Sequence, residues 1–258
     1  MLRPRIIPCL LIHKGGLVKT TGFGQPKYIG DPLNAVRIFN EKEVDELMVL
    51  DIDATREGRE PDYKLIASLA AECRMPLAYG GGVHRVDQFE RLISLGVEKV
   101  SISAAAVLTP ALIGEAASRV GSQSVVVVID VKQVNGRHKA WINNGTRLVT
   151  KDPVELARMA QAEGAGEIVL NSIDRDGLMQ GYELDLLRKV RSAVSLPITC
   201  LGGAGSLADI SDLINEFGVI GAAAGSLFVF KGKYRAVLIN YPSRADKDAL
   251  VATAMGTA

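Results

Sequence analysis

The sequence has little that would mark a secreted or membrane-spanning protein. Its opening apolar run lasts about seven residues and contains Pro8, which is short for the core of a signal peptide. No apolar run approaches the roughly 20 residues that cross a bilayer. The three cysteines, Cys9, Cys73 and Cys200, are odd in number and far apart, so neither a disulfide framework nor a metal site is predicted. We expect a cytoplasmic protein with reduced thiols, no metal ion and no other cofactor.

The chain also has almost no net charge of either sign. The net charge is +1, and the basic residues are scattered along the chain, so we predict neither a nucleic-acid surface nor a membrane-binding patch. Small acidic ligands remain possible at local sites. No break in composition marks a linker within the 258 residues, of which 48% are hydrophobic. The chain is therefore expected to form a single domain.

What the sequence does contain is a regular alternation of short apolar runs and amphipathic stretches. This pattern is typical of parallel strands joined by crossover helices. At this length, eight such units favour a closed (β/α)8 TIM barrel over an open sheet. The strand-like runs cover residues 5–12, 46–52, 75–80, 98–103, 124–131, 167–173, 196–202 and 219–225.

An internal repeat supports the barrel and divides it into two halves. "DELMVLDIDATREG" at 45–58 parallels "GEIVLNSIDRDG" at 166–177, and residues 75–100 parallel 196–221 in the same way. We therefore predict two fused half-barrels, about 1–120 and 121–241, followed by a tail at 242–258 that is expected to fray. The first strands of the two halves then place Leu11 opposite Asp130.

Two glycine motifs, "YGGGV" at 79–83 and "LGGAG" at 201–205, follow equivalent strands. Ligands bind at the carboxyl ends of strands in such barrels, and each motif precedes a helix whose free N–H groups can hold a phosphate. A tight turn is the alternative for either motif alone. Their symmetry favours two phosphate sites for a ligand with a phosphate at each end. The predicted contacts are Gly81, Gly82, Ser103, Gly177, Gly202, Gly203, Gly225 and Ser226.

Three aspartates, Asp51, Asp130 and Asp176, lie at strand ends or just beyond them. A carboxylate there can act as a general acid or base or contact a ligand. The alternatives are a loop-capping role for Asp51 and a turn-shaping role for Asp176. Asp130 is the best catalytic candidate, because packing does not explain an aspartate at the end of "VVVVI".

Four charged residues stand at or near the starts of strands, at the opposite end of the predicted barrel. They are Arg5, Glu46, Lys99 and Glu167. Four solvated strand starts are one interpretation. The other is a neutralising ring turned inward across the barrel floor, since two charges of each sign supply the partners that buried charges need.

Residues 3–230 resemble the HisF-like cyclase subunit of imidazole glycerol phosphate synthase, from histidine biosynthesis. The motifs that carry the resemblance include "RIIPCL", "DELMVLDI", "GGGVH", "VVVVID", "GAGEIVLNSIDRDG" and "LPITCLGGAG". The resemblance implies that a HisH-like glutaminase docks on the amino-terminal face and that ammonia crosses the barrel to a bis-phosphate substrate. It also implies that the four floor charges are an ammonia gate, that the glycine motifs hold phosphate, and that Lys19 is a mobile first-loop lysine.

The sequence departs from that family at Leu11. The family has an aspartate there and another at the position of Asp130, and the two share acid and base duties in cyclisation. Leucine transfers no proton, and losing one of two such groups typically costs about 10²–10⁴-fold in rate. The first loop, "HKGGLVKTTGFGQPKY", departs as well. This combination resembles the acetamidino-modification paralogues of bacterial surface-polysaccharide biosynthesis.

Three hypotheses follow, and the choice between the first two decides whether the chain is itself an enzyme. The first is a conduit that activates a glutaminase and passes ammonia to a sugar amidotransferase, which modifies a nucleotide-linked sugar for lipopolysaccharide or O-antigen. A dry interior would keep ammonia unprotonated. The second is a working cyclase in which water or another side chain replaces the missing carboxylate. The third is a phosphosugar isomerase on a similar barrel, which the charged quartet and "VVVVID" argue against.

Overall fold

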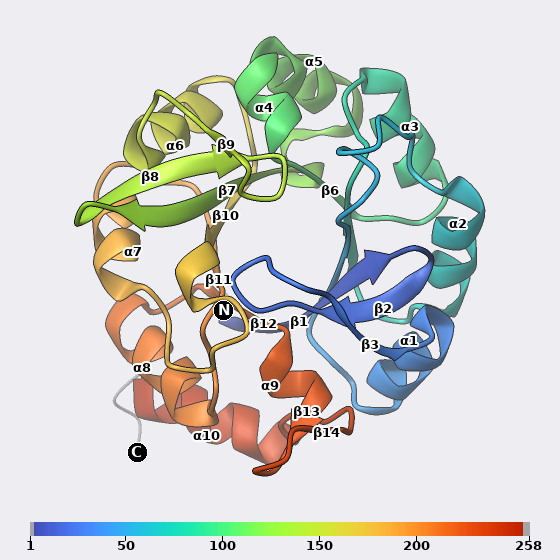
Figure 1. The fold of residues 1–258 in the computed structure, drawn as a ribbon, viewed down its shortest axis with the longest axis vertical. Coiled ribbons are helices and arrows are strands. Elements are labelled where there is room, and N and C mark those ends of the chain that lie inside the picture. The colour runs from blue at the N-terminus through green and yellow to red at the C-terminus, as the bar shows by residue number, and fades with distance from the viewer. Residues whose placement is uncertain (1–2, 255–258) are drawn as a thin grey trace.

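A computed structural model describes residues 3–254 and shows a closed barrel of parallel strands inside a layer of helices (Figure 1). Each barrel strand pairs with the next along the chain, and the ring closes where β12 pairs with β1. The predicted (β/α)8 TIM barrel is confirmed. Its strands are β1 (Arg5–His13), β4 (Leu47–Asp51), β5 (Leu77–Gly80), β6 (Lys99–Ile102), β7 (Val125–Val134), β10 (Glu167–Ser172), β11 (Ile198–Leu201) and β12 (Gly221–Ala224).

Each outer helix carries an apolar stripe, and α1, α2, α6 and α8 begin at a residue whose side chain caps the helix. In α8, for example, Ser206 Oγ accepts the N–H of Asp209, and Ile210, Leu213 and Ile214 are buried on one face. The outer helices are α1 (Pro32–Glu41), α2 (Tyr63–Glu72), α3 (Val86–Ser94), α5 (Ala111–Val120), α6 (Pro153–Ala162), α7 (Leu184–Arg191) and α8 (Leu207–Phe217). Shorter pieces are α4 (Ala104–Leu108), α9 (Ser226–Val229) and the 3-10 turns η1 (Ser122–Ser124) and η2 (Ile173–Arg175).

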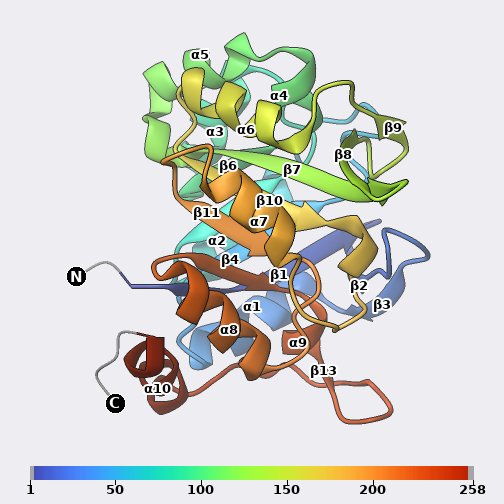
Figure 2. The same cartoon turned by 90° about the vertical axis from the view of Figure 1, so that its left-hand side faces the viewer.

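The first strand of each predicted half continues into an antiparallel hairpin at the carboxyl end of the barrel. After β1 the chain forms β2 (Gly16–Lys19) and β3 (Lys27–Gly30). After β7 it forms β8 (Arg137–Ile142) and β9 (Arg147–Leu148). The two long polar loops thus lie at the same end of the barrel (Figure 2).

The barrel interior is a second apolar cluster, separate from the core between strands and helices. Because side chains alternate along a strand, Ile7 and Cys9 of β1 face inward. They meet Met48, Ala78, Val126, Val128, Val169, Leu201 and Ala223. An apolar layer therefore lies between the two ends of the barrel.

The C-terminal segment differs from the frayed tail predicted for residues 242–258. After a small hairpin, β13 (Phe230–Lys231) and β14 (Ala236–Val237), residues Arg244–Ala254 form α10. Ser243 and Asp246 cap this helix reciprocally, and Lys247 Nζ lies 2.7 Å from the Asp45 carboxylate. The reciprocal caps and this ion pair stabilise the helix. Residues 255–258 lie outside the described part of the chain.

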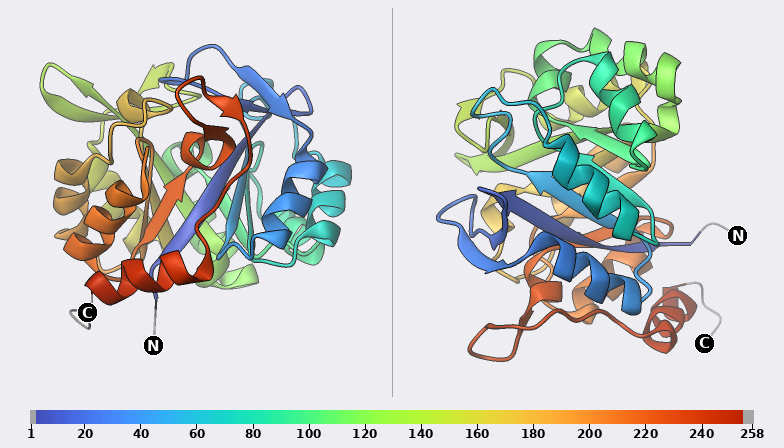
Figure 3. Two further views of the ribbon diagram at one scale, coloured as in Figure 1. Left: turned by 90° about the horizontal axis from the view of Figure 1, so that it is seen from below. Right: turned by 90° about the vertical axis from the view of Figure 1, so that its right-hand side faces the viewer.

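Both ends of the described chain lie at the amino-terminal end of the barrel, and α10 lies across that end (Figures 2 and 3). Within residues 3–254 no helix combines the length and apolar character needed to span a bilayer.

Candidate functional site

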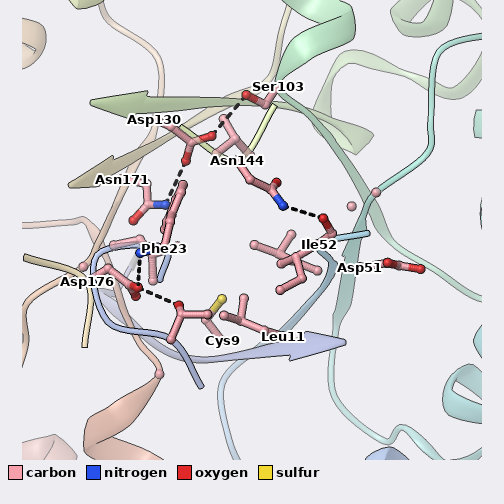
Figure 4. A pocket seen from close by; sticks show the side chains of 18 of the residues that line it. Cys9, Leu11, Phe23, Asp51, Ile52, Ser103, Asp130, Asn144, Asn171 and Asp176 are labelled. Atoms are coloured by element: carbon pink, nitrogen blue, oxygen red, sulfur yellow. Dashed lines mark hydrogen bonds between the residues drawn. The ribbon is translucent and has the colours of Figure 1, made fainter. Parts of the chain in front are cut away.

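A pocket of about 210 Å³ opens at the carboxyl ends of the barrel strands (Figure 4). The sequence predicted its lining well, because every predicted ligand or catalytic residue contributes to the wall. They are Leu11, Lys19, Asp51, Gly81, Gly82, Ser103, Asp130, Asp176, Gly177, Gly202, Gly203, Gly225 and Ser226. Residues far apart in the sequence therefore meet in one cavity.

Asp130 is a buried carboxyl group with two polar neighbours. Asn171 Nδ2 donates to one carboxylate oxygen over 2.8 Å, and Ser103 Oγ donates to the other over 3.3 Å. Burial raises the pKa of Asp130 to about 6, although these two hydrogen bonds act to lower it. A carboxyl group with that pKa can gain or lose a proton near neutral pH.

The opposite wall is apolar. Leu11 pairs with Leu50 across β1 and β4, whereas the equivalent pair across β7 and β10 is Asp130 with Asn171. Leu11 is partly buried against the interior cluster and points into the pocket (Figure 4). In the first half-barrel two leucines thus stand where the second half-barrel has a polar pair, and neither leucine can exchange a proton.

The backbone conformation at the two glycine motifs leaves no room for a side chain. Gly81 has φ +122°, and a Cβ there would lie 2.4 Å from the Asp51 carbonyl oxygen. Gly203 has φ +112°, with a Cβ only 2.1 Å from the Gly181 carbonyl oxygen. Glycine is therefore needed at both places for steric reasons.

Two short helices begin beside these motifs in matching conformations. The residue before α4 is Ser103, with φ −116° and ψ −76°, and the residue before α9 is Gly225, with φ −101° and ψ −71°. Neither helix start has a side-chain cap. The unused N–H groups of each first turn lie at the pocket wall.

Lys19 is a buried cation at one end of the pocket. Its Nζ donates to the Cys9 carbonyl oxygen over 2.5 Å and lies against Gly225. Burial lowers the pKa of Lys19, while Cys9 and Asp176 act to raise it. Among residues 3–254 no carboxylate lies within 4 Å of this ammonium group, so an anion at this end would supply the missing partner.

Asp51 and Asp176 each have a local structural task. Asp51 Oδ1 accepts the N–H groups of Asp53 and Ala54 over 2.9 and 3.0 Å. Asp176 Oδ2 accepts Thr20 Oγ1 over 2.6 Å and the N–H of Phe23 over 3.2 Å. These bonds match the loop-capping and turn-shaping alternatives, and Asp176 also holds the first loop over the pocket.

At the barrel floor the four predicted gate residues form a closed ring of ion pairs. Arg5 pairs with Glu46 and, over 2.7 Å, with Glu167. Lys99 Nζ lies 2.7 Å from Glu46 and 2.9 Å from Glu167. Burial alone would raise the pKa of Glu167, but Arg5 and Lys99 hold it below its usual value. The geometry matches the inward ring, and four solvated strand starts are ruled out.

Comparison with known proteins identifies the family of this barrel. The family profile described as "Histidine biosynthesis protein" matches residues 5–235. The chain belongs to this family. A Leptospira interrogans protein, provisionally named imidazole glycerol phosphate synthase subunit HisF, is 57% identical over 252 residues, covering 97% of this chain and 99% of that relative. A Pseudomonas aeruginosa protein, provisionally named subunit hisF2, is 54% identical over 243 residues, or 94% of this chain and 97% of that relative.

A further relative, from Hyphomonas neptunium, is named imidazole glycerol phosphate synthase subunit HisF without qualification. It is 41% identical over 230 residues, which is 89% of this chain and 91% of that relative. The resemblance to HisF-like subunits is thus confirmed along almost the whole chain.

In this HisF-like barrel the sequence interpretation missed a histidine–aspartate pair. His13 Nδ1 lies 2.9 Å from Asp53 Oδ1, and Asp53 Oδ2 accepts the N–H of Lys14 over 2.9 Å. Burial would raise the pKa of Asp53, but His13 and the Lys14 N–H lower it overall. Both side chains line the pocket. The period-two alternation along β1 was the available signal, since His13 lies on the same strand face as Leu11.

Asn171 was also missed. Its place in the repeat, 121 residues after Leu50 in the sequence, marks it as the polar counterpart of that leucine. Its hydrogen bond to Asp130 appears only when β7 and β10 pair.

Proposed function

We propose that this chain is the barrel subunit of a glutamine amidotransferase complex, in which a HisH-like glutaminase docks on the amino-terminal face. The barrel carries ammonia to its carboxyl-terminal mouth and delivers it to a sugar amidotransferase. The product would be an acetamidino-modified, nucleotide-linked sugar for a surface polysaccharide. The observation that carries this proposal is the ion-pair ring kept intact beneath a mouth that has lost one of its two carboxylates.

The apolar character of the barrel interior supports this proposal. Between the ring and the pocket the wall is the apolar cluster of Ile7, Cys9, Val126 and their neighbours. One hydroxyl in this region, Ser101 Oγ, is buried without a hydrogen-bond partner. An apolar passage disfavours ammonium relative to ammonia, so the nucleophile would arrive unprotonated.

The relatives' names support a role outside the ordinary cyclase. The relatives from Leptospira interrogans, Vibrio vulnificus and Pseudomonas aeruginosa, at 57, 55 and 54% identity, are named provisionally, the last two as hisF3 and hisF2, whereas the relative named HisF without qualification is 41% identical. Numbered names such as hisF2 and hisF3 fit additional gene copies whose products deliver ammonia to a different acceptor enzyme.

The test mixes the purified chain with a HisH-like glutaminase, the sugar amidotransferase and glutamine labelled with nitrogen-15 in the side-chain amide. We expect glutamine hydrolysis to rise at least about tenfold over the glutaminase alone. Sugar product should carry the label even when unlabelled ammonium is present in the buffer, because the nitrogen travels inside the protein. Absence of glutaminase activation would reject the proposal.

A second candidate, a working cyclase, is favoured by the His13–Asp53 pair. An aspartate-oriented imidazole near the pocket wall is the usual form of a general base. With Asp130 on the opposite side, it would restore a proton-transfer group on the wall that Leu11 has made apolar. Lys19 at one end and the α4 helix start at the other fit a ligand with two phosphates.

Substitution of Leu11 separates the two candidates. With the cyclase substrate and ammonium salt, we expect turnover at least about 10²-fold below that of an ordinary cyclase. Leu11→Asp should raise this trace rate, whereas Leu50→Asp, which adds the same carboxylate one strand away, should not. Full turnover by the natural chain, abolished in His13→Asn, would establish the cyclase instead.

A further inference from the structure

Three hairpins project around the mouth of the barrel, and their charge differs from that of the rest of the chain. They are β2–β3, β8 with its partners β7 and β9, and β13–β14 (Figures 1 and 3). Three stretches of the sequence that contain no aspartate or glutamate, residues 1–30, 131–151 and 217–245, include the projecting parts of these hairpins. Asp130 of β7 lies just outside the second stretch. Because the whole chain holds 29 acidic residues, the projecting parts are basic relative to the rest of the chain.

We call six exposed cations on these hairpins the basic collar. They are Lys27, Lys132, Arg137, Lys231, Lys233 and Arg235. Within residues 3–254 none of them lies within 4 Å of a carboxylate. The nearby carboxylates of Asp174 and Asp176 instead accept hydrogen bonds from neutral donors, the N–H of Gln133 and the hydroxyl of Thr20. The collar cations are therefore available to pair with carboxylates of another protein.

The collar is continuous with the pocket. Arg235 donates to the carbonyl oxygen of Gly177, a pocket residue, over 2.9 Å. The Arg235 guanidinium and the Lys27 ammonium both lie over the Phe230 ring, 5.0 and 5.3 Å from its centre. These contacts join the third hairpin to the first at the rim.

Apolar side chains stand beside these cations. Of ten exposed large hydrophobic residues in the described chain, six are on the three hairpins. They are Tyr28, Val134, Leu148, Tyr234, Val237 and Leu238, and Tyr234 is 89% exposed. Exposed apolar groups among charges of one sign are typical of a protein interface and less so of a phosphate-backbone surface.

We propose that the basic collar docks an acidic protein surface, that of the enzyme which receives ammonia at the mouth. This inference rests on the proposed function, because ammonia leaving the pocket must enter the acceptor before water protonates it. Charge complementarity selects an acidic partner and aligns its entrance with the pocket, and the exposed tyrosines and aliphatic side chains supply the apolar contact. A ring of contacts around the mouth would also exclude water from the junction.

The test uses the complete assembly with the double variant Arg137→Glu and Lys233→Glu, one reversal on each of two hairpin turns. The matched control is Lys64→Glu with Arg158→Glu, which reverses two exposed charges on α2 and α6. Glutaminase activation at the opposite face should be unchanged in both. Affinity for the sugar amidotransferase should fall at least about tenfold in the collar variant alone, and the loss should shrink as salt screens the charges.

Each alternative result has a defined meaning. If the natural chain activates the glutaminase and delivers labelled nitrogen, and the collar variant does both equally well, the collar proposal is wrong while the proposed function stands. If the natural chain does neither, both are wrong. Tyr234→Ala should weaken binding without changing its salt dependence. Binding of a DNA duplex at physiological salt that the collar reversals abolish would assign the collar to nucleic acid and overturn the proposal.

Discussion

At the scale of single residues, the site is decided by what stands at two equivalent positions. Asp130 keeps a carboxyl group with Asn171 and Ser103 as partners, whereas Leu11 and Leu50 leave the facing wall apolar. A buried carboxyl group without a cation destabilises the fold when ionised. Its position in the wall of the pocket therefore points to a functional role rather than to packing.

Asp130→Asn should stabilise the protein at neutral pH. The pKa of Asp130 is raised to about 6 in the folded state, so the folded state holds the proton more tightly than the unfolded state. Stability therefore falls as pH rises from about 4 to 6, and the full penalty is present above 6. We expect a gain on the order of 1–3 kcal/mol at pH 7.5 that largely disappears at pH 4, measured by urea denaturation.

Asp87→Asn is the control for that prediction. The hydrogen bond from Arg85 lowers the pKa of this exposed aspartate, so its neutralisation should bring no gain at neutral pH. A gain for Asp130→Asn that does not change with pH would contradict the assignment.

At the scale of elements, one short turn holds two segments at the pocket mouth, which we call the flaps: residues 20–24 of the first loop and residues 132–135 of the hairpin that β7 forms with β8. Within and just after η2, the Asp174 carboxylate accepts the N–H of Gln133 over 2.6 Å, and the Asp176 carboxylate accepts Thr20 and Phe23. The first acid thus holds the hairpin after β7, and the second holds the loop between β2 and β3. Two neighbouring carboxylates therefore fasten one flap from each half-barrel.

The hydrogen bonds of Asp174 and those of Asp176 should each hold one flap independently of the other. Asp176→Ala removes two hydrogen bonds to the first loop, so amide hydrogen exchange at residues 20–24 should accelerate, by about fivefold or more if each bond contributes about 1 kcal/mol. Exchange at residues 132–135 should stay the same. In Asp174→Ala, exchange should accelerate at residues 132–135 and stay the same at residues 20–24. Equal acceleration in both flaps in either variant would disprove the independent roles of the two carboxylates.

At the scale of the whole molecule, charge is arranged along the barrel axis. The floor carries a ring that is neutral within itself, the middle is apolar, and the mouth carries the unpaired collar. The ring stabilises the fold only as a set, because removing one member leaves a partly buried charge unpaired.

Glu167→Gln should therefore cost about 2–4 kcal/mol of unfolding free energy, as two cations are left with one carboxylate. The double variant Glu167→Gln with Lys99→Gln restores neutrality and should recover part of that loss. Urea denaturation of both single variants and the double variant measures this coupling. Strictly additive effects would show that the four charges act independently.

Much of the barrel and the glycine and aspartate residues of the pocket wall followed from the sequence, for identifiable reasons. Strand and helix periods, the half-barrel repeat and the glycine turns are local properties, so they predicted eight units and the places where strands end. The repeat also predicted that Leu11 faces Asp130 across the barrel. The sequence did not predict helix α10, because the alanine-rich stretch gave no sign of the caps and the ion pair found there.

What the sequence alone determined is the order of elements, the presence of a leucine at position 11 opposite Asp130, and the identity of the four floor charges. Only the tertiary structure decided that those charges point inward as a ring and that His13 meets Asp53. It also gathered basic residues that are scattered in the sequence into one collar. The physical reason is barrel closure, which brings together segments about a hundred residues apart, whereas composition and periodicity report only on neighbours along the chain.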